Sequence, residues 1–143
     1  ISLAKTTLLE EKMSANMFDM KLGFQATESG LVEGEQWILA QTAEPTPTIG
    51  CGQPCVFPLA PAVYPEDQTS GWWTANTALY TGALNLITSN PRYYIEYYRF
   101  VPDSPAIGQG VPAGVHYYRV SARGTGGSNL SLSILQSTVA RRY

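Results

Sequence analysis

The sequence contains little charge for its length. Asp, Glu, Lys and Arg make up 14% of the 143 residues, compared with about 25% in typical soluble proteins, and hydrophobic residues make up 44%. This composition excludes a disordered tail, a coiled-coil rod and a zinc-finger array. The net charge of -2 gives no positive field that could hold a polyanion, so no nucleic acid is expected as a partner. The length fits a single domain over residues 1–143.

The sequence also lacks long apolar runs. No run reaches about 18 apolar residues, so the sequence as it stands offers no membrane span. It has no signal peptide and opens with Ile1 rather than Met. We interpret this start as a cut through something longer, made either at a processing site or at an artificial boundary.

Residue patterns for catalysis and metal binding are missing. His116 is the single histidine, and neither a His-x-His nor a His-Glu-x-x-His spacing surrounds it. There is no Gly-x-Ser-x-Gly motif for an activated serine. The glycine-rich stretch at 108–113 does not open a helix, as a nucleotide site must, and the one at 124–127 has the wrong spacing. We therefore predict turns at both stretches and expect no catalytic residue, metal or cofactor.

Two acidic pairs have the residue types of an acid and a base or of calcium ligands. They are Glu33 with Glu35 and Glu66 with Asp67. Neither pair has the alternating carboxylate spacing of a calcium loop. We expect both pairs to lie on a solvated surface.

Cysteine occurs only twice, at Cys51 and Cys55. Three residues separate the two thiols, so the pair is neither a C-x-x-C redox motif nor half of a repeated zinc site. We predict a disulfide, which would mark an oxidising compartment such as the periplasm or the cell exterior. Because the closed loop is small, the bond is expected to pin a Pro-rich loop rather than to hold the fold together.

The first forty residues predict one long α-helix. Its apolar stripe has spacings of 4, 3, 4, 3, 4 and 7 and consists of Met13, Met17, Met20, Phe24, Thr27, Leu31 and Ile38. The prolines from Pro45 onward must end the helix, which we place at 1–41. Gly23 and Gly30 inside it predict either a bend or the close approach of another backbone.

This helix is too long for its own domain to cover. It would measure roughly 60 Å, whereas a compact domain of this size has a radius of gyration of about 14 Å. Another molecule is therefore expected to cover the exposed apolar side chains. The candidate subunit-interface residues are Leu3, Leu8, Leu9, Met13 and Met17.

The rest of the chain divides into two parts. Residues 42–92 are rich in proline and are predicted to be irregular. Residues 93–143 are dense in aromatic and β-branched residues and predict an antiparallel sheet, with a hairpin turn at 124–129. The expected fold class is α+β, with the N-terminal helix packed on the C-terminal sheet.

Charge is distributed unevenly along the chain. Residues 22–91 contain acidic residues but no Lys or Arg, whereas residues 92–143 contain six Arg and only Glu96 and Asp103. The two regions attract each other electrostatically, either within one chain or between neighbouring copies.

The helix resembles that of type IV pilus minor pilins of the PilX kind. The family pattern is a Met, an Asn three residues later, an Asp three further, and then Phe-Gln-Ala-Ala-Glu and Gly-Glu. The stretch 118–127 and the C-terminal end of the chain also resemble the last hairpin of that family. The matching helix residues are Met13, Asn16, Asp19, Phe24, Gln25, Ala26, Glu28, Gly34 and Glu35.

The resemblance implies a pilin-like fold and a structural, non-enzymatic subunit of the pilus. Such pilins lose a leader peptide and are held in the inner membrane by an apolar N-terminal anchor, with the globular part in the periplasm. They then join other minor pilins and the major pilin in the extracellular pilus. The resemblance thus implies a minor pilin that helps to prime assembly and sits near the pilus tip, with its anchor outside this sequence.

A second interpretation remains open, namely a secreted or surface-exposed adhesin. A loop carrying Trp72 and Trp73, together with the tyrosine-rich sheet, would contact a glycan or a host surface. Adjacent tyrosines place one ring on each face of a strand, so they fit either core packing or an outward aromatic patch. An exposed aromatic platform would favour the adhesin.

Overall fold

The computed structural model describes residues 2–58, 60, 63–105, 108, 110 and 112–143, with the backbone alone described for residues 2 and 3. Its helices are α1 (Ser2–Leu39), the short 3-10 helix η1 (Pro65–Asp67) and α2 (Ser70–Asn76). Its strands are β1 (Val56–Phe57), β2 (Ala78–Leu79), β3 (Arg92–Pro102), β4 (Gly114–Thr125) and β5 (Leu132–Arg141).

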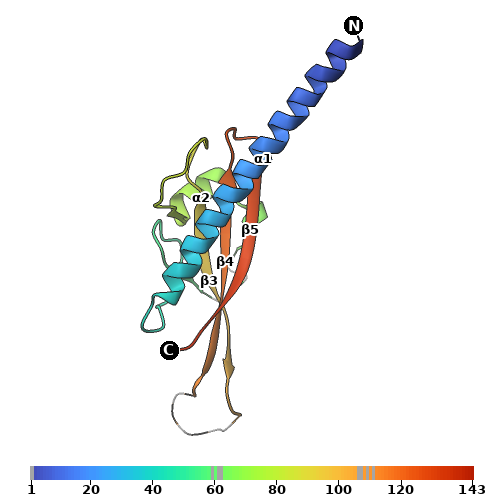
Figure 1. Ribbon diagram of the computed structural model, residues 1–143. Helices are drawn as coiled ribbons and strands as arrows, with labels where there is room; N and C mark the ends of the chain where they lie inside the picture. The colour runs from blue at the N-terminus through green and yellow to red at the C-terminus, as the bar shows by residue number, and fades with distance from the viewer. Residues whose placement is uncertain (1, 59, 61–62, 106–107, 109, 111) are drawn as a thin grey trace.

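Helix α1 lies across one face of the sheet and extends well beyond it. Figure 1 shows its N-terminal part leaving one end of the molecule, while the far ends of β3 and β4 extend from the other. The arrangement confirms the predicted α+β fold, with a long N-terminal helix over a C-terminal sheet. The helix ends at Leu39, close to the expected end at 41.

The sheet has the strand order β1-β3-β4-β5, with β2 also paired to β3. The predicted antiparallel pairing holds for β3, β4 and β5. The chain turns between β4 and β5 at 126–131, two residues later than the predicted 124–129, because Gly124 and Thr125 still pair within β4. The turn predicted at 108–113 lies partly outside the described residues. The sheet is nevertheless mixed, because β1 pairs in parallel with β3, placing Val56 opposite Ile95. A strand of two residues is too short to show a periodic pattern, so β1 could not be predicted from the sequence.

The segment 42–92 is more ordered than predicted. It contains β1 and β2, which belong to the sheet, together with η1 and α2, and α2 packs on the sheet face opposite α1. Phe57, Trp73 and Tyr94 form a buried cluster on that face, and the disulfide between Cys51 and Cys55 packs against it. The disulfide thus pins the Pro-rich segment to this cluster.

Three glycines bring α1 close to the sheet, and Ile38 packs into the core between helix and sheet, with Leu31 and Trp37 partly buried against it. A Cβ atom added at Gly34 would lie 2.7 Å from Cγ1 of Val120, and one added at Gly30 would lie 3.2 Å from Cβ of Pro91. At Gly23 the added atom would lie 2.8 Å from the carbonyl oxygen of Ser131. Because α1 continues unbroken through these positions, its glycines serve close approach to the sheet rather than a bend.

Asp19 joins α1 to the turn between β4 and β5. Its carboxylate accepts hydrogen bonds from the backbone N–H of Ser128 at 3.0 Å and from the Ser128 hydroxyl at 2.5 Å. These bonds, with a further one from Ser131, hold the pKa of Asp19 below its ordinary value of 3.8. Asp19 is one of the positions that match the pilin pattern, and its role here is to fix the turn on the helix.

Replacing Asp19 with Asn should destabilise the folded chain at neutral pH. Because the pKa of Asp19 is lower in the folded state than in the unfolded state, the ionised carboxylate stabilises the fold above an unfolded-state pKa of about 3.9. That contribution is lost as the pH falls through the folded-state pKa. Urea unfolding at a series of pH values should therefore show that the free energies of unfolding of the wild type and the Asp19→Asn variant become equal below about pH 4. A difference in the free energy of unfolding that persists unchanged into strong acid would contradict this role of Asp19.

Candidate functional site

The N-terminal half of α1 makes little contact with the rest of the chain. Residues 4–18 are all exposed, whereas the buried positions of the helix begin at Gly23. Figure 1 shows this half projecting away from the sheet. Several apolar side chains follow one another along this half and are available to another molecule.

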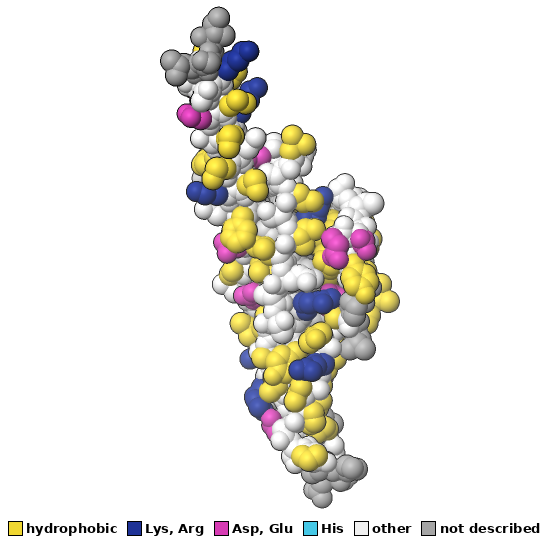
Figure 2. All heavy atoms as spheres, turned by 90° about the vertical axis from the view of Figure 1, so that its right-hand side faces the viewer, with side chains coloured by type: hydrophobic (Ala, Val, Ile, Leu, Met, Phe, Trp, Pro, Cys, Tyr) yellow, Lys and Arg dark blue, Asp and Glu magenta, His cyan; other side chains and the backbone are white. Residues whose placement is uncertain are grey.

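Four of the five predicted interface residues are exposed on this half. Leu8 is 52% exposed, Leu9 60%, Met13 63% and Met17 60%. Figure 2 shows hydrophobic side chains along the projecting helix. Leu3 also lies in α1, but its side chain is outside the described part of the structure.

The exposed apolar surface extends further than the sequence predicted. Met20 is 63% exposed and Phe24 is 46% exposed, although both lie nearer the sheet. With spacings of 4, 4, 3 and 4, these side chains share one side of the helix with the predicted residues. We call this surface the α1 stripe, defined as Leu9, Met13, Met17, Met20 and Phe24.

The glycines explain why Met20 and Phe24 are exposed. Both residues belong to the apolar stripe that the helical spacing predicts, but neither is among the predicted interface residues. The sheet instead packs on the side of α1 that carries Gly23, Gly30 and Gly34. Of the predicted stripe, Thr27 and Ile38 are also turned toward the sheet and are 0% exposed. The spacing of those glycines was the signal in the sequence that identifies the sheet-facing side.

Charge on the projecting half does not oppose association. Lys5 and Lys12 balance Glu10 and Glu11. Two copies of this helix, or this helix and a similar one, therefore approach without net repulsion from these four groups.

Trp72 and Trp73 do not form the exposed part of an aromatic platform. Trp72 and Trp73 lie on α2 rather than on a loop, and Trp73 is 0% exposed. The ring of Trp73 packs 5.3 Å from that of Tyr94, and the partly buried ring of Trp72 lies 5.7 Å from it. The two tryptophans are therefore core residues, because α2 turns them toward the sheet.

The acidic pairs form no acid and base arrangement. The Glu33 carboxylate accepts a hydrogen bond from the backbone N–H of Thr81 at 3.1 Å and another from its hydroxyl, which ties α1 to the loop after β2. Burial, and then the charge of Glu33, raises the pKa of Tyr93. Glu66 and Asp67 are exposed on η1, as expected.

His116 lies among aromatic rings. The centroid of its ring is 4.7 Å from that of Phe100 and 5.3 Å from that of Tyr143, and its Nδ1 atom is 3.6 Å from a carboxylate oxygen of Glu44. Within the described residues, no group of three or more His, Cys, Asp or Glu side chains could hold a metal ion. The surroundings of His116 fit a packing role.

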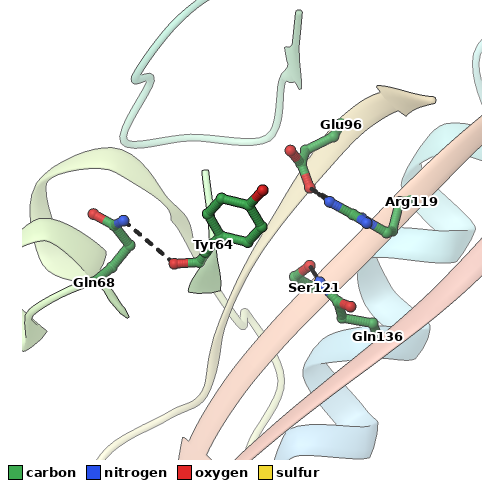
Figure 3. A network of polar contacts seen from close by, with 6 residues as sticks. All are labelled: Tyr64, Gln68, Glu96, Arg119, Ser121 and Gln136. Atoms are coloured by element: carbon green, nitrogen blue, oxygen red, sulfur yellow. Dashed lines mark hydrogen bonds and ion pairs between the residues drawn. The ribbon is translucent and has the colours of Figure 1, made fainter. Parts of the chain in front are cut away.

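A buried ion pair lies on the sheet face opposite α1, and sequence analysis did not predict it. Figure 3 shows Glu96 of β3 joined to Arg119 of β4. Arg119 donates to one Glu96 oxygen from Nη2 at 3.0 Å and from Nε at 3.2 Å, and the Glu96 side chain is 0% exposed. Figure 3 also shows Ser121 of β4 bonded to Gln136 of β5, at 2.9 Å. Polar pairs thus fix the register of β3, β4 and β5.

Comparison with known proteins identifies one family. The family model described as Type IV pilus assembly protein PilX C-term matches residues 34–141, about three quarters of the chain. The match covers every strand of the sheet and begins at residue 34, after the projecting half of α1. No curated protein and no solved structure matches the chain. Across its described residues, no helix is both long and apolar enough to cross a membrane. The chain belongs to the PilX family of type IV pilus assembly proteins.

Proposed function

We propose that this chain is a structural minor pilin whose α1 stripe packs against the helices of neighbouring pilins. The observation that carries the proposal is the exposure of five large apolar side chains along one side of α1, on a helix that its own sheet does not cover. Contiguous apolar surface of this kind marks an interaction site. Membership of a pilus assembly family supports pilins as the partners.

The stripe contains enough apolar surface to drive association. Each Leu or Met side chain that becomes fully buried contributes about 1.5–3 kcal/mol. Ordering the side chains and losing rotational freedom oppose this gain, so several contacts are needed. The five residues of the stripe, with Leu8 beside it, supply them over nearly five helical turns.

The proposal includes a place in the assembly sequence. The resemblance to minor pilins supports a role in priming pilus assembly together with other minor pilins, near the pilus tip. Before assembly the sheet would face the periplasm, and an apolar anchor preceding α1 would hold the protein in the inner membrane. The disulfide is compatible with an oxidising compartment.

Two single variants of the full-length protein, Leu9→Asp and Met13→Asp, should each sharply reduce the number of pili. Loss of each apolar contact, at about 1.5–3 kcal/mol, corresponds to a roughly 10- to 100-fold weaker association. Pili counted by electron microscopy give the measurement. The thermal unfolding of the 143-residue chain should hardly change, because both side chains are exposed.

The matched control is Ala15→Asp. Ala15 is also exposed on the projecting half, but it lies two residues from both Met13 and Met17 and therefore on another side of the helix. The control adds the same charge to the same helix and should leave pilus numbers near those of the wild type. Normal piliation in the Leu9 and Met13 variants would refute the α1 stripe as an interface.

A further inference from the structure

A polar hollow lies on the sheet face opposite α1, away from the α1 stripe. Its volume is about 540 Å³, and it lies between α2, the start of β3, the end of β4 and the turn that follows β4. Its polar lining includes the side chains of Ser70, Thr74, Arg92, Arg123 and Asn129. The residues that line it include no carboxylate.

Two arginines lie side by side in the lining of the hollow. Arg92 and Arg123 are directly opposed in the pairing of β3 with β4. Like charges directly opposite each other destabilise a sheet, so this arrangement is costly in the absence of an anion. Both side chains are partly buried, which limits relief of the repulsion by water.

Neither arginine forms an ion pair with a described residue. Arg119 and Arg142, by contrast, each pair with a carboxylate, at 3.0 and 2.7 Å. Arg92 donates from Nη1 to the backbone oxygen of Thr77 at 2.9 Å, and the guanidinium of Arg123 lies 6.0 Å from the ring centroid of Trp73. Burial lowers the pKa of Arg123, as expected for a cation without a counter-ion. The remaining guanidinium donors are available to a ligand.

The size and lining of the hollow favour a ligand larger than a simple ion. A volume of about 540 Å³ falls within the range of about 300–1,000 Å³ that small-molecule sites occupy. Ser70, Thr74 and Asn129 offer hydroxyl and amide groups around the two cations, and Leu79 offers an apolar side chain. Hydroxyl groups on the ligand would pair with the neutral polar groups.

We propose that the Arg92 and Arg123 hollow binds an acidic sugar. The carboxylate or phosphate of the sugar lies between the two guanidinium groups, which match oxyanions through charge-assisted hydrogen bonds. The sugar hydroxyls bond to Ser70, Thr74 and Asn129. This site is independent of the α1 stripe and of the proposed role in pilus assembly.

Titration of the 143-residue chain with matched sugars tests the proposal. Glucuronate and glucose 6-phosphate should both shift the NMR signals of residues around the hollow, and glucose should bind at least about tenfold more weakly because it lacks the charged group. Inorganic phosphate should also bind more weakly than glucose 6-phosphate. Equal binding of glucose would overturn the role of the arginines, and equal binding of phosphate would overturn the role of the sugar ring.

Variants connect the binding to the two cations. Arg123→Gln should weaken binding of glucuronate by about tenfold or more, since one charge-assisted contact is lost. Arg99→Gln is the matched control, because Arg99 lies on β3 outside the hollow, and it should bind as the wild type does. Thr74→Glu keeps both arginines and places a competing carboxylate at an exposed position of the lining, so it should abolish binding without disturbing the core.

Three further results would overturn the proposal. They are the absence of binding by the wild type at millimolar sugar, undiminished binding by a folded Arg123→Gln variant, and undiminished binding by Thr74→Glu. Loss of pilus assembly in Arg123→Gln without any binding of sugar would point instead to an acidic side chain of a neighbouring subunit as the occupant.

Discussion

Arg119→Met should reduce the free energy of unfolding by about 3–5 kcal/mol, one of the largest losses available to a single substitution in this chain. The change removes the cation that lies 3.0 Å from the carboxylate of Glu96. The Glu96 side chain is 0% exposed, so water cannot replace the lost partner without rearrangement of the sheet. A buried carboxylate without its cation is far more costly than the net gain from the original pair. Urea unfolding followed by circular dichroism at neutral pH measures the loss.

Glu96→Gln provides the matched control for this pair. The amide has the same shape and keeps an oxygen that accepts from Arg119, and the Arg119 side chain is 24% exposed and can reach water. The control should therefore lose less than half of the stability that Arg119→Met loses. Equal losses in the two variants would show that packing, rather than an uncompensated charge, dominates at this position.

Gly34→Leu should destabilise the chain by about 1–3 kcal/mol or more, even though leucine forms helices better than glycine. A Cβ atom at Gly34 would lie 2.7 Å from Val120 and 2.9 Å from the ring of Tyr93. Both neighbours are almost fully buried and have no room to move aside. The larger side chain must therefore lift α1 from the sheet. Thermal unfolding measures the effect as a lower midpoint temperature.

Gly30→Ala tests the same contact with less crowding. Its added Cβ atom would lie 3.2 Å from Pro91, and the better helix propensity of alanine, about 1 kcal/mol, offsets part of the strain. We expect a small change in the midpoint. A Gly34→Leu variant as stable as Gly30→Ala would show that the helix and sheet adjust to each other freely, against the close packing described above.

Periodic elements could be predicted from the sequence, and contacts between distant segments could not. Helix α1 and the β4–β5 hairpin have apolar spacing or turn residues that act locally. The strand β1 has only two residues, and its parallel partner in β3 is distant in sequence. Trp72 and Trp73 appeared in the sequence as an exposed pair because no local signal shows that α2 turns them inward.

Only part of the candidate interface could be predicted, because the rest depends on how α1 packs on the distant sheet. The exposure of Leu8, Leu9, Met13 and Met17 followed from helix length alone. The exposure of Met20 and Phe24 depends on which side of α1 meets the sheet, and that side is selected by the three glycines. The opposition of Arg92 and Arg123 depends on strand register, which their sequence positions do not specify.

The projecting half of α1 should be the least stable part of the helix in the isolated chain. Residues 4–18 receive almost no tertiary support, and a helix of about this length is marginal in water by itself. In the 143-residue chain taken by itself, the stability of this helix declines from the sheet toward residue 4, so its outer turns open before the body of the protein unfolds. Docking of a neighbouring helix would then extend structured backbone as well as bury side chains. Part of the binding free energy would be spent on winding those turns, which makes attachment more readily reversible than the apolar area alone implies.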